Sequence, residues 1–169
     1  MLEAILITAV VGVTAVAAWT DHRTGHIPNW ITLPVLVAAP VFHGLTSGVH
    51  AAGLSLAGAI LVGVIPFLVF RSGGLGGGDV KLFMAIGALV GAGLGFRIEL
   101  YSFLAGACFG LLLLIKRRQL GLALRQAWRS MTRPFTRGAE PAAAAADLGS
   151  IRFGPLIFLA TVATVFGVV

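Results

Sequence analysis

The chain has 169 residues, of which 58% are hydrophobic and 11% charged, with a formal net charge of +6. Soluble domains usually carry about 25% charged residues, so this composition excludes an ordinary soluble core and indicates a membrane protein. Its single cysteine, Cys108, lies in an apolar run. One cysteine excludes an internal disulfide and a multi-cysteine zinc site.

Six apolar stretches are candidates for membrane spans, which need about 20 mostly apolar residues each. In chain order the expected spans are residues 2–19, 30–45, 51–70, 82–96, 98–115 and 153–169. A tight turn is expected between the fourth and fifth, and a long loop (116–152) before the sixth. Gly87, Gly91 and Gly95 are four apart and predict a close-packing helix face. The sequence predicts one all-α domain over residues 1–169, a bundle of six transmembrane helices.

The Lys and Arg residues are distributed very unevenly among the five loops. The first, third and fifth loops hold eleven of the twelve: Arg23, Arg71, Lys81, Lys116, Arg117, Arg118, Arg125, Arg129, Arg133, Arg137 and Arg152. The remaining one, Arg97, lies in the fourth loop. Positive residues stay cytoplasmic, so we expect these three loops inside and both termini outside. The net charge then reflects topology and lipid contact, and no nucleic-acid partner is expected.

The fifth loop has a pattern of its own. Leu120, Leu124, Trp128 and Met131 recur at helical spacing, with arginines off that stripe. This predicts a basic amphipathic helix on the anionic lipids of the cytoplasmic leaflet. A solvated basic loop is the alternative.

Two of the six acidic residues, Asp21 and Asp79, fall at the same predicted cytoplasmic boundary. The other four are expected at outer ends of spans or in the linker: Glu3, Glu99, Glu140 and Asp147. Two carboxyls brought close together share one proton, so one acts as base and the other as acid toward a water. The alternative is that each aspartate only caps a helix end. Their spacing alone does not choose between the two.

The residues before Asp79 are unusually rich in glycine. Positions 72–81 read Ser-Gly-Gly-Leu-Gly-Gly-Gly-Asp-Val-Lys. Such a loop lets backbone N–H groups approach an extended peptide or an oxyanion. The Gly-Lys-Ser/Thr ending of a phosphate loop is absent, so nucleotide binding is not expected.

These local sequences resemble the signatures of a known family. Residues 76–79, Gly-Gly-Gly-Asp, resemble the Gly-x-Gly-Asp motif of membrane-embedded aspartic proteases. With Lys81 they are similar to the second signature of the type IV prepilin peptidases. Residues 21–29, Asp-His-Arg-Thr-Gly-His-Ile-Pro-Asn, resemble that family's first signature, and 151–155, Ile-Arg-Phe-Gly-Pro, its short motif before the last span. The resemblance covers nearly the whole chain.

The resemblance implies an aspartic endopeptidase of the bacterial inner membrane. It would cleave the basic leader from type IV prepilins at the cytoplasmic face, with Asp21 and Asp79 as the catalytic pair and no cofactor. Gly76, Gly77 and Gly78 would form the substrate-binding loop with Lys81, for which the residues themselves indicate no role. The prepilin is the implied partner, with the pilus-assembly machinery as a further one.

The chain differs from the larger bifunctional members of that family. Those carry an extra amino-terminal region with a four-cysteine zinc segment, associated with N-methylation of the new pilin terminus. This chain starts directly with a span and has one cysteine, so methyltransferase activity is not expected. The smaller form resembles the peptidases of Tad/Flp pilus systems, with archaeal preflagellin peptidases as the alternative.

The histidines and the membrane location allow other kinds of function. His22 and His26 could bind a metal with Asp21, but Gly25 and Pro28 argue against a regular helix there, so no metal site is expected. His43 and His50 are expected at the surface. A small membrane carrier, or a scaffold of a secretion complex using the aspartates structurally, remains the alternative from another class. Against a carrier, no acidic residue is expected at mid-span.

Overall fold

The structure, a computed structural model, describes residues 1–116 and 152–167 of the chain. It divides into two compact units, Met1–Phe103 with Arg152–Val169, and Leu104–Ile151. The described residues form helices joined by short turns, with no strand among them. The predicted all-α class is therefore confirmed. The predicted amphipathic helix of the fifth loop lies outside the described residues.

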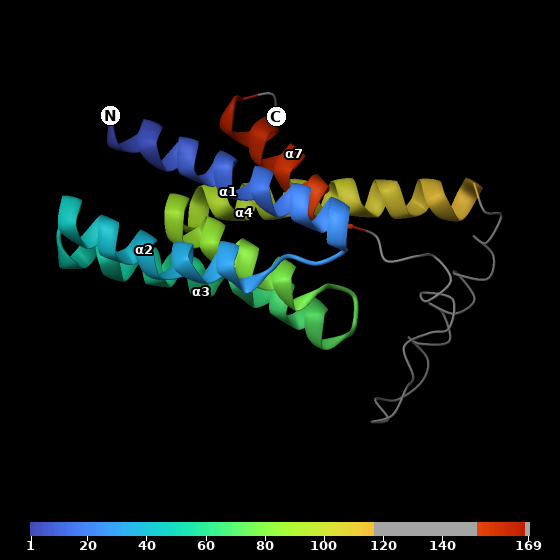
Figure 1. Ribbon diagram of the computed structural model, residues 1–169, viewed down its shortest axis with the longest axis horizontal. Coiled ribbons are helices and arrows are strands. Elements are labelled where there is room, and N and C mark those ends of the chain that lie inside the picture. Colours follow the sequence, from blue (N-terminus) through green and yellow to red (C-terminus); the bar gives the residue numbers. More distant parts are fainter. Residues whose placement is uncertain (117–151, 168–169) are drawn as a thin grey trace. The chain divides into compact units, whose positions relative to one another are not determined.

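Five helices carry the described residues: α1 (Leu2–Thr24), α2 (Asn29–Ser47), α3 (Val49–Arg71), α4 (Gly77–Lys116) and α7 (Gly154–Val165) (Figure 1). In the first unit, α1 packs against α7, and α2 against α3. α2 turns directly into α3 at Gly48, whose φ of 90° is one that residues other than glycine rarely adopt. The two helices therefore form a tight antiparallel hairpin.

The expected spans correspond in order to α1, α2, α3, the two parts of α4, and α7. α1 runs past the apolar stretch to Thr24, where Gly25 ends it with a φ of 74°. Four described helices are long and apolar enough to cross a membrane, namely α1 to α4. α7 has 12 described residues, fewer than the about 20 that a span needs. The count of six spans and the outward termini stay predictions.

α4 is interrupted at Gly91, where φ is 77° and ψ is 172°. The turn expected between residues 96 and 98 is therefore wrong in position, because the chain is helical there. Gly91 also leaves the helix face on which it was expected beside Gly87 and Gly95. A β-carbon on Gly87 would clash with the Gly58 backbone, and one on Gly95 would lie 2.7 Å from Val62 Cγ2. These two glycines confirm close packing, here between α3 and the part of α4 on each side of the break.

The break at Gly91 frees two backbone carbonyls that side chains then satisfy. In an unbroken helix the carbonyls of Ala88 and Leu89 would accept from residues four positions on. Instead Ser55 Oγ donates to the Ala88 oxygen at 2.7 Å, and His43 Nε2 lies 3.1 Å from the Leu89 oxygen. Because a carbonyl can only accept, Nε2 carries the proton. His43 is thus half-buried in a structural contact, and its expected place at the surface is wrong.

Glu99 also differs from expectation. It was expected at the outer end of a span, but it lies inside α4, about two turns beyond Gly91, and is 2% exposed. Neither of its carboxylate oxygens has a hydrogen-bond partner among the described residues. Burying a polar group without a partner is costly, so Glu99 needs an explanation that the aspartate pair does not provide.

Candidate active site

The glycine-rich segment ends earlier than its sequence suggests, because α4 already begins at Gly77. Gly77, Gly78 and Asp79 form the first turn of this helix and only residues 72–76 remain as the turn. Asp79 Oδ2 accepts a hydrogen bond from the Gly76 N–H at 3.1 Å. A carboxylate at the third helical position that reaches back in this way caps the helix. Asp79 therefore makes the capping contact considered above, through one of its two oxygens.

The first turn of α4 gives a physical reason for the Gly-x-Gly-Asp pattern. A β-carbon on Gly76 would lie 2.9 Å from Asp79 Oδ2, and one on Gly78 would lie 2.8 Å from the Ile27 carbonyl oxygen. Both distances are shorter than real β-carbons show. A β-carbon on Gly77 would meet Phe70 Cε2 at 3.5 Å, an ordinary contact. The fixed position at Gly78 therefore excludes a side chain, one at Gly76 would displace the Asp79 carboxylate, and the variable position tolerates one.

Asp21 lies in the last turn of α1 and is 5% exposed. Its Oδ2 accepts a hydrogen bond from the Gly154 N–H at 2.9 Å. Gly154 is the first residue of α7, and the first N–H groups of a helix have no partner within it and carry partial positive charge. A β-carbon on Gly154 would lie 2.8 Å from Asp21 Cβ. α7 therefore begins directly against the Asp21 carboxylate.

Gly154 is a site residue that the sequence reasoning missed. Residues 153–155, Phe-Gly-Pro, match a family motif, and this match is the signal that could have identified Gly154. The motif by itself assigns Gly154 no role. Its partner is 133 residues away in the chain. Only the packing of α1 against α7 brings the two together.

The two aspartates interact electrostatically. Asp79 lies before the apolar stretch of α4 that starts at Leu82. Burial, and to a smaller extent the negative charge of Asp21, raises the pKa of Asp79 from 3.8 to about 6, and the hydrogen bond from the Gly76 N–H opposes this rise. A neighbouring carboxylate has this effect only at short range. The charge of Asp21 thus acts on the Asp79 carboxyl, although the two residues lie on separate helices.

Lys81 lies two residues beyond Asp79. Its Nζ donates to Asn29 Oδ1 at 2.7 Å, so the last residue of one matched segment contacts the last residue of the other. The first turn of α4 is also close to Ile27 through Gly78. Residues 27–29 and 78–81 therefore meet at two points beside the aspartates.

The histidines of the first loop lie apart from this contact. His22, in the last turn of α1, and His26 are both exposed. Within residues 1–116 and 152–167, no three His, Cys, Asp or Glu side chains are grouped as a metal ion would need. The described part of the site is thus a pair of carboxyls with backbone N–H donors.

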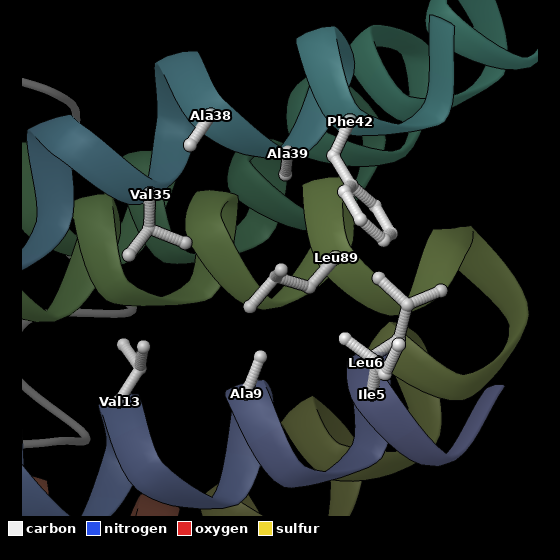
Figure 2. A pocket seen from close by; sticks show the side chains of 9 residues that line it. All are labelled: Ile5, Leu6, Ala9, Val13, Val35, Ala38, Ala39, Phe42 and Leu89. Carbon is white, nitrogen blue, oxygen red and sulfur yellow. The ribbon is translucent and has the colours of Figure 1, made fainter. Parts of the chain in front are cut away.

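An apolar pocket of about 240 Å³ opens between α1, α2 and α4 (Figure 2). Its lining side chains are all apolar: Ile5, Leu6, Ala9, Val13, Val35, Ala38, Ala39, Phe42 and Leu89. Figure 2 shows the Phe42 ring and Leu89 turned toward the α1 side chains across the opening. With no titratable group in its lining, this pocket offers contacts to apolar groups and no chemistry of its own.

The site and the helices define a class, a helical membrane protein with two interacting carboxyls at the ends of separate helices. The chain belongs to the type IV leader peptidase family, whose model matches residues 8–114. This match includes both aspartates and Lys81, and ends before Gly154.

A relative from Bacillus subtilis (strain 168), named prepilin leader peptidase/N-methyltransferase, is 36% identical over 98 residues. That alignment covers 56% of this chain, and 39% of the relative's own length. The chain therefore matches well under half of that protein. No solved structure matches the chain.

Proposed function

We propose that this chain is an aspartic endopeptidase that removes the basic leader from type IV prepilins, using Asp21 and Asp79. The observation that carries the proposal is the Asp79 carboxyl, whose pKa is raised by burial and, to a smaller extent, by the charge of Asp21 from a separate helix. Family membership supports the reaction class. The two helix-capping contacts do not oppose it, since each uses one carboxylate oxygen, Oδ2.

The chemistry follows from one proton shared by the pair. The ionised carboxylate takes a proton from a water, and the water oxygen attacks the carbonyl carbon of the scissile peptide. The protonated partner donates to the carbonyl oxygen as the tetrahedral intermediate forms. The nitrogen then takes the proton that the first carboxyl removed from the water, the C–N bond breaks, and the new amino terminus leaves. A hydroxyl of the intermediate returns its proton to the pair as the new carboxyl group forms, so the pair again holds one proton. Because the two carboxyls would share one proton, neither role is assigned to one residue.

The charge of the two aspartates and their depth in the membrane indicate the substrate class. In the proposed orientation both aspartates face the cytoplasm at the inner membrane, and an acidic pair there attracts a basic leader. The apolar helix that follows the leader would stay in the bilayer, beside the bundle. A Tad/Flp-type prepilin is the proposed substrate, with an archaeal-type preflagellin as the alternative. Anionic lipids at the basic fifth loop and the pilus-assembly machinery are the further partners proposed.

N-methylation is not part of the proposal. The name of the Bacillus subtilis relative includes N-methyltransferase, but this chain matches 39% of that protein. The residues that support cleavage provide no methyl-transfer chemistry. We expect the new amino terminus of a cleaved pilin to carry no added methyl group, which mass spectrometry of the product would reveal.

Glu99 favours one alternative, a proton carrier, because buried carboxyls within membrane helices are typical of proton pathways. Among residues 1–116 and 152–167 the one other buried acid is Asp21, at the end of α1, and a single acid within a span would not complete a pathway. Proteoliposomes loaded with a pH-sensitive dye separate the two functions. A peptidase should show no proton flux, and a flux that Glu99→Gln removes would favour the carrier.

The direct test is coexpression with a small Tad-type prepilin, followed by gel electrophoresis of the membrane fraction. Cells that hold both proteins should accumulate the shorter, processed pilin, and cells that hold the prepilin alone should not. If the leader stays attached in the presence of well-inserted protein, the proposed function is wrong for this substrate class. A preflagellin in a parallel culture tests the alternative substrate.

A further inference from the structure

Lys81 is the residue of the matched signatures that the proposed chemistry does not use. It follows Asp79 by two positions, so its side chain leaves α4 about 200° around the helix from the Asp79 carboxyl. Its Nζ contacts Asn29 Oδ1 at 2.7 Å. Asn29 is the first residue of α2 and ends the first matched segment. The lysine therefore faces the start of another helix instead of the aspartate pair.

A second contact lies on the same turn of α4. Gly78 approaches Ile27 so closely that an added β-carbon would lie 2.8 Å from the Ile27 carbonyl oxygen and 3.3 Å from its nitrogen. Gly78 and Lys81 are three residues apart, which places both on one side of the helix. Ile27 and Asn29 are two residues apart at the start of α2. One side of the α4 turn thus rests against residues 27–29, with a close backbone approach at one end and a charge-assisted hydrogen bond at the other.

This contact lies between the two segments that carry the aspartates. Asp21 is fixed at the end of α1, and residues 25–28 connect it to Asn29. Asp79 lies between the two contacting residues of α4, Gly78 and Lys81. A change in how α4 rests on residues 27–29 would therefore act on the turn that carries Asp79.

We propose that Lys81 and Asn29 form a positioning pair, whose hydrogen bond holds the first turn of α4 in the orientation that aligns Asp79 with Asp21. The inference rests on the proposed peptidase function and gives Lys81 a role within it. Lys81 would not recruit the leader, because a lysine repels a basic peptide. The bond is charge-assisted and therefore directional, as a positioning contact requires.

Four single variants and one double variant test the pair. Lys81→Met and Asn29→Leu remove the hydrogen bond, whereas Lys81→Arg and Asn29→Asp keep a donor or an acceptor. With purified enzyme in detergent and a purified Tad-type prepilin, the first two should lower kcat about tenfold or more and leave KM within about twofold. The conservative two should stay within about threefold of wild type. The double variant Lys81→Met/Asn29→Leu should be no slower than the worse single variant, because both remove one interaction.

Any other outcome contradicts the proposal that Lys81 and Asn29 act as a positioning pair. If the effects of the two single changes multiply in the double variant, the residues act separately. A rise in KM for Lys81→Met alone would mean that this lysine binds substrate. Equal rates for all variants would mean that the bond has no part in catalysis. Wild-type size-exclusion profiles, with the assay run well below each variant's unfolding midpoint, show that a lost rate does not come from misfolding.

The experiment distinguishes failure of the proposed positioning role from failure of the proposed peptidase function. If wild-type protein does not cleave the prepilin, the peptidase proposal fails before any variant is compared. If wild type cleaves and the variants match it, only the positioning role fails. In the first case a double-mutant cycle on the unfolding midpoint still tests the Asn29–Lys81 contact, because it needs no substrate.

Discussion

Gly78 offers a sharp test of how the first turn of α4 shapes the site, because Gly77 beside it is a matched control. A β-carbon on Gly78 would lie 2.8 Å from the Ile27 carbonyl oxygen and 2.9 Å from Ile27 Cβ. Carbon atoms in good contact are about 3.5–4.0 Å apart, so Gly78→Ala must move this turn by roughly 0.5–1 Å. Gly77→Ala would place its β-carbon 3.5 Å from Phe70 Cε2, where nothing has to move.

The two substitutions should differ strongly in rate. A shift of about 1 Å at a catalytic group can slow a reaction about 100-fold, and overpacking costs about 1–3 kcal/mol of stability. We therefore expect Gly78→Ala to cleave about 100-fold more slowly than wild type. Gly77→Ala should cleave normally and be as stable or slightly more so, since alanine is favoured over glycine in helices by about 0.5–1 kcal/mol.

Initial rates of leader release, measured by gel densitometry on purified enzyme, compare the two variants. Thermal-unfolding midpoints recorded on the same samples separate a displaced turn from a destabilised protein. Equal rates for Gly78→Ala, Gly77→Ala and wild type would refute the claim that the approach of Gly78 to Ile27 positions Asp79.

Three further predictions concern Gly154, Glu99 and Asp79. Gly154→Ala should slow leader release about 100-fold, because its β-carbon would lie 2.8 Å from Asp21 Cβ; an unchanged rate would show that α7 does not position Asp21. Glu99→Gln should leave the cleavage rate within about threefold, since Glu99 lies in the interior of α4, well beyond the first turn that carries Asp79; a tenfold loss of rate would contradict this. The raised pKa of Asp79, 3.8 to about 6, means that its protonated form favours the folded state. This contribution is complete below about pH 4 and is lost as the pH rises through about 6, so wild type should lose stability across that range more steeply than Asp79→Asn; parallel curves would argue against the raised pKa.

The motif residues of the site could be predicted because their constraints are local. A β-carbon on Gly76 would displace the Asp79 carboxylate, one on Gly78 would clash with the Ile27 backbone, and Asp79 caps the helix in whose first turn it lies. Such constraints leave a short sequence pattern that can be recognised. The contact of Gly154 with Asp21 could not be derived in the same way, because it depends on how α7 packs on α1.

The break in α4 shows a different limit of sequence reasoning. Gly87, Gly91 and Gly95 have the same spacing and apolar neighbours, and nothing local decides which one takes a positive φ. The charged Arg97 indicates a turn that the structure has six residues earlier, at Gly91. Because the turn lies at Gly91, Glu99 falls inside the helix and not at the outer end of a span, where it was expected. The donors that stabilise the break, from His43 and Ser55, come from two other helices.

The most direct test of the central claim is leader release by purified protein in proteoliposomes, with the product identified by mass spectrometry. Wild type should cut a Tad-type prepilin once, after its basic leader. Asp21→Asn and Asp79→Asn should each release no leader while they insert and unfold like wild type, because an amide can neither accept nor supply the shared proton. Cleavage by either variant at the wild-type rate would contradict the claim that these two aspartates form the catalytic pair.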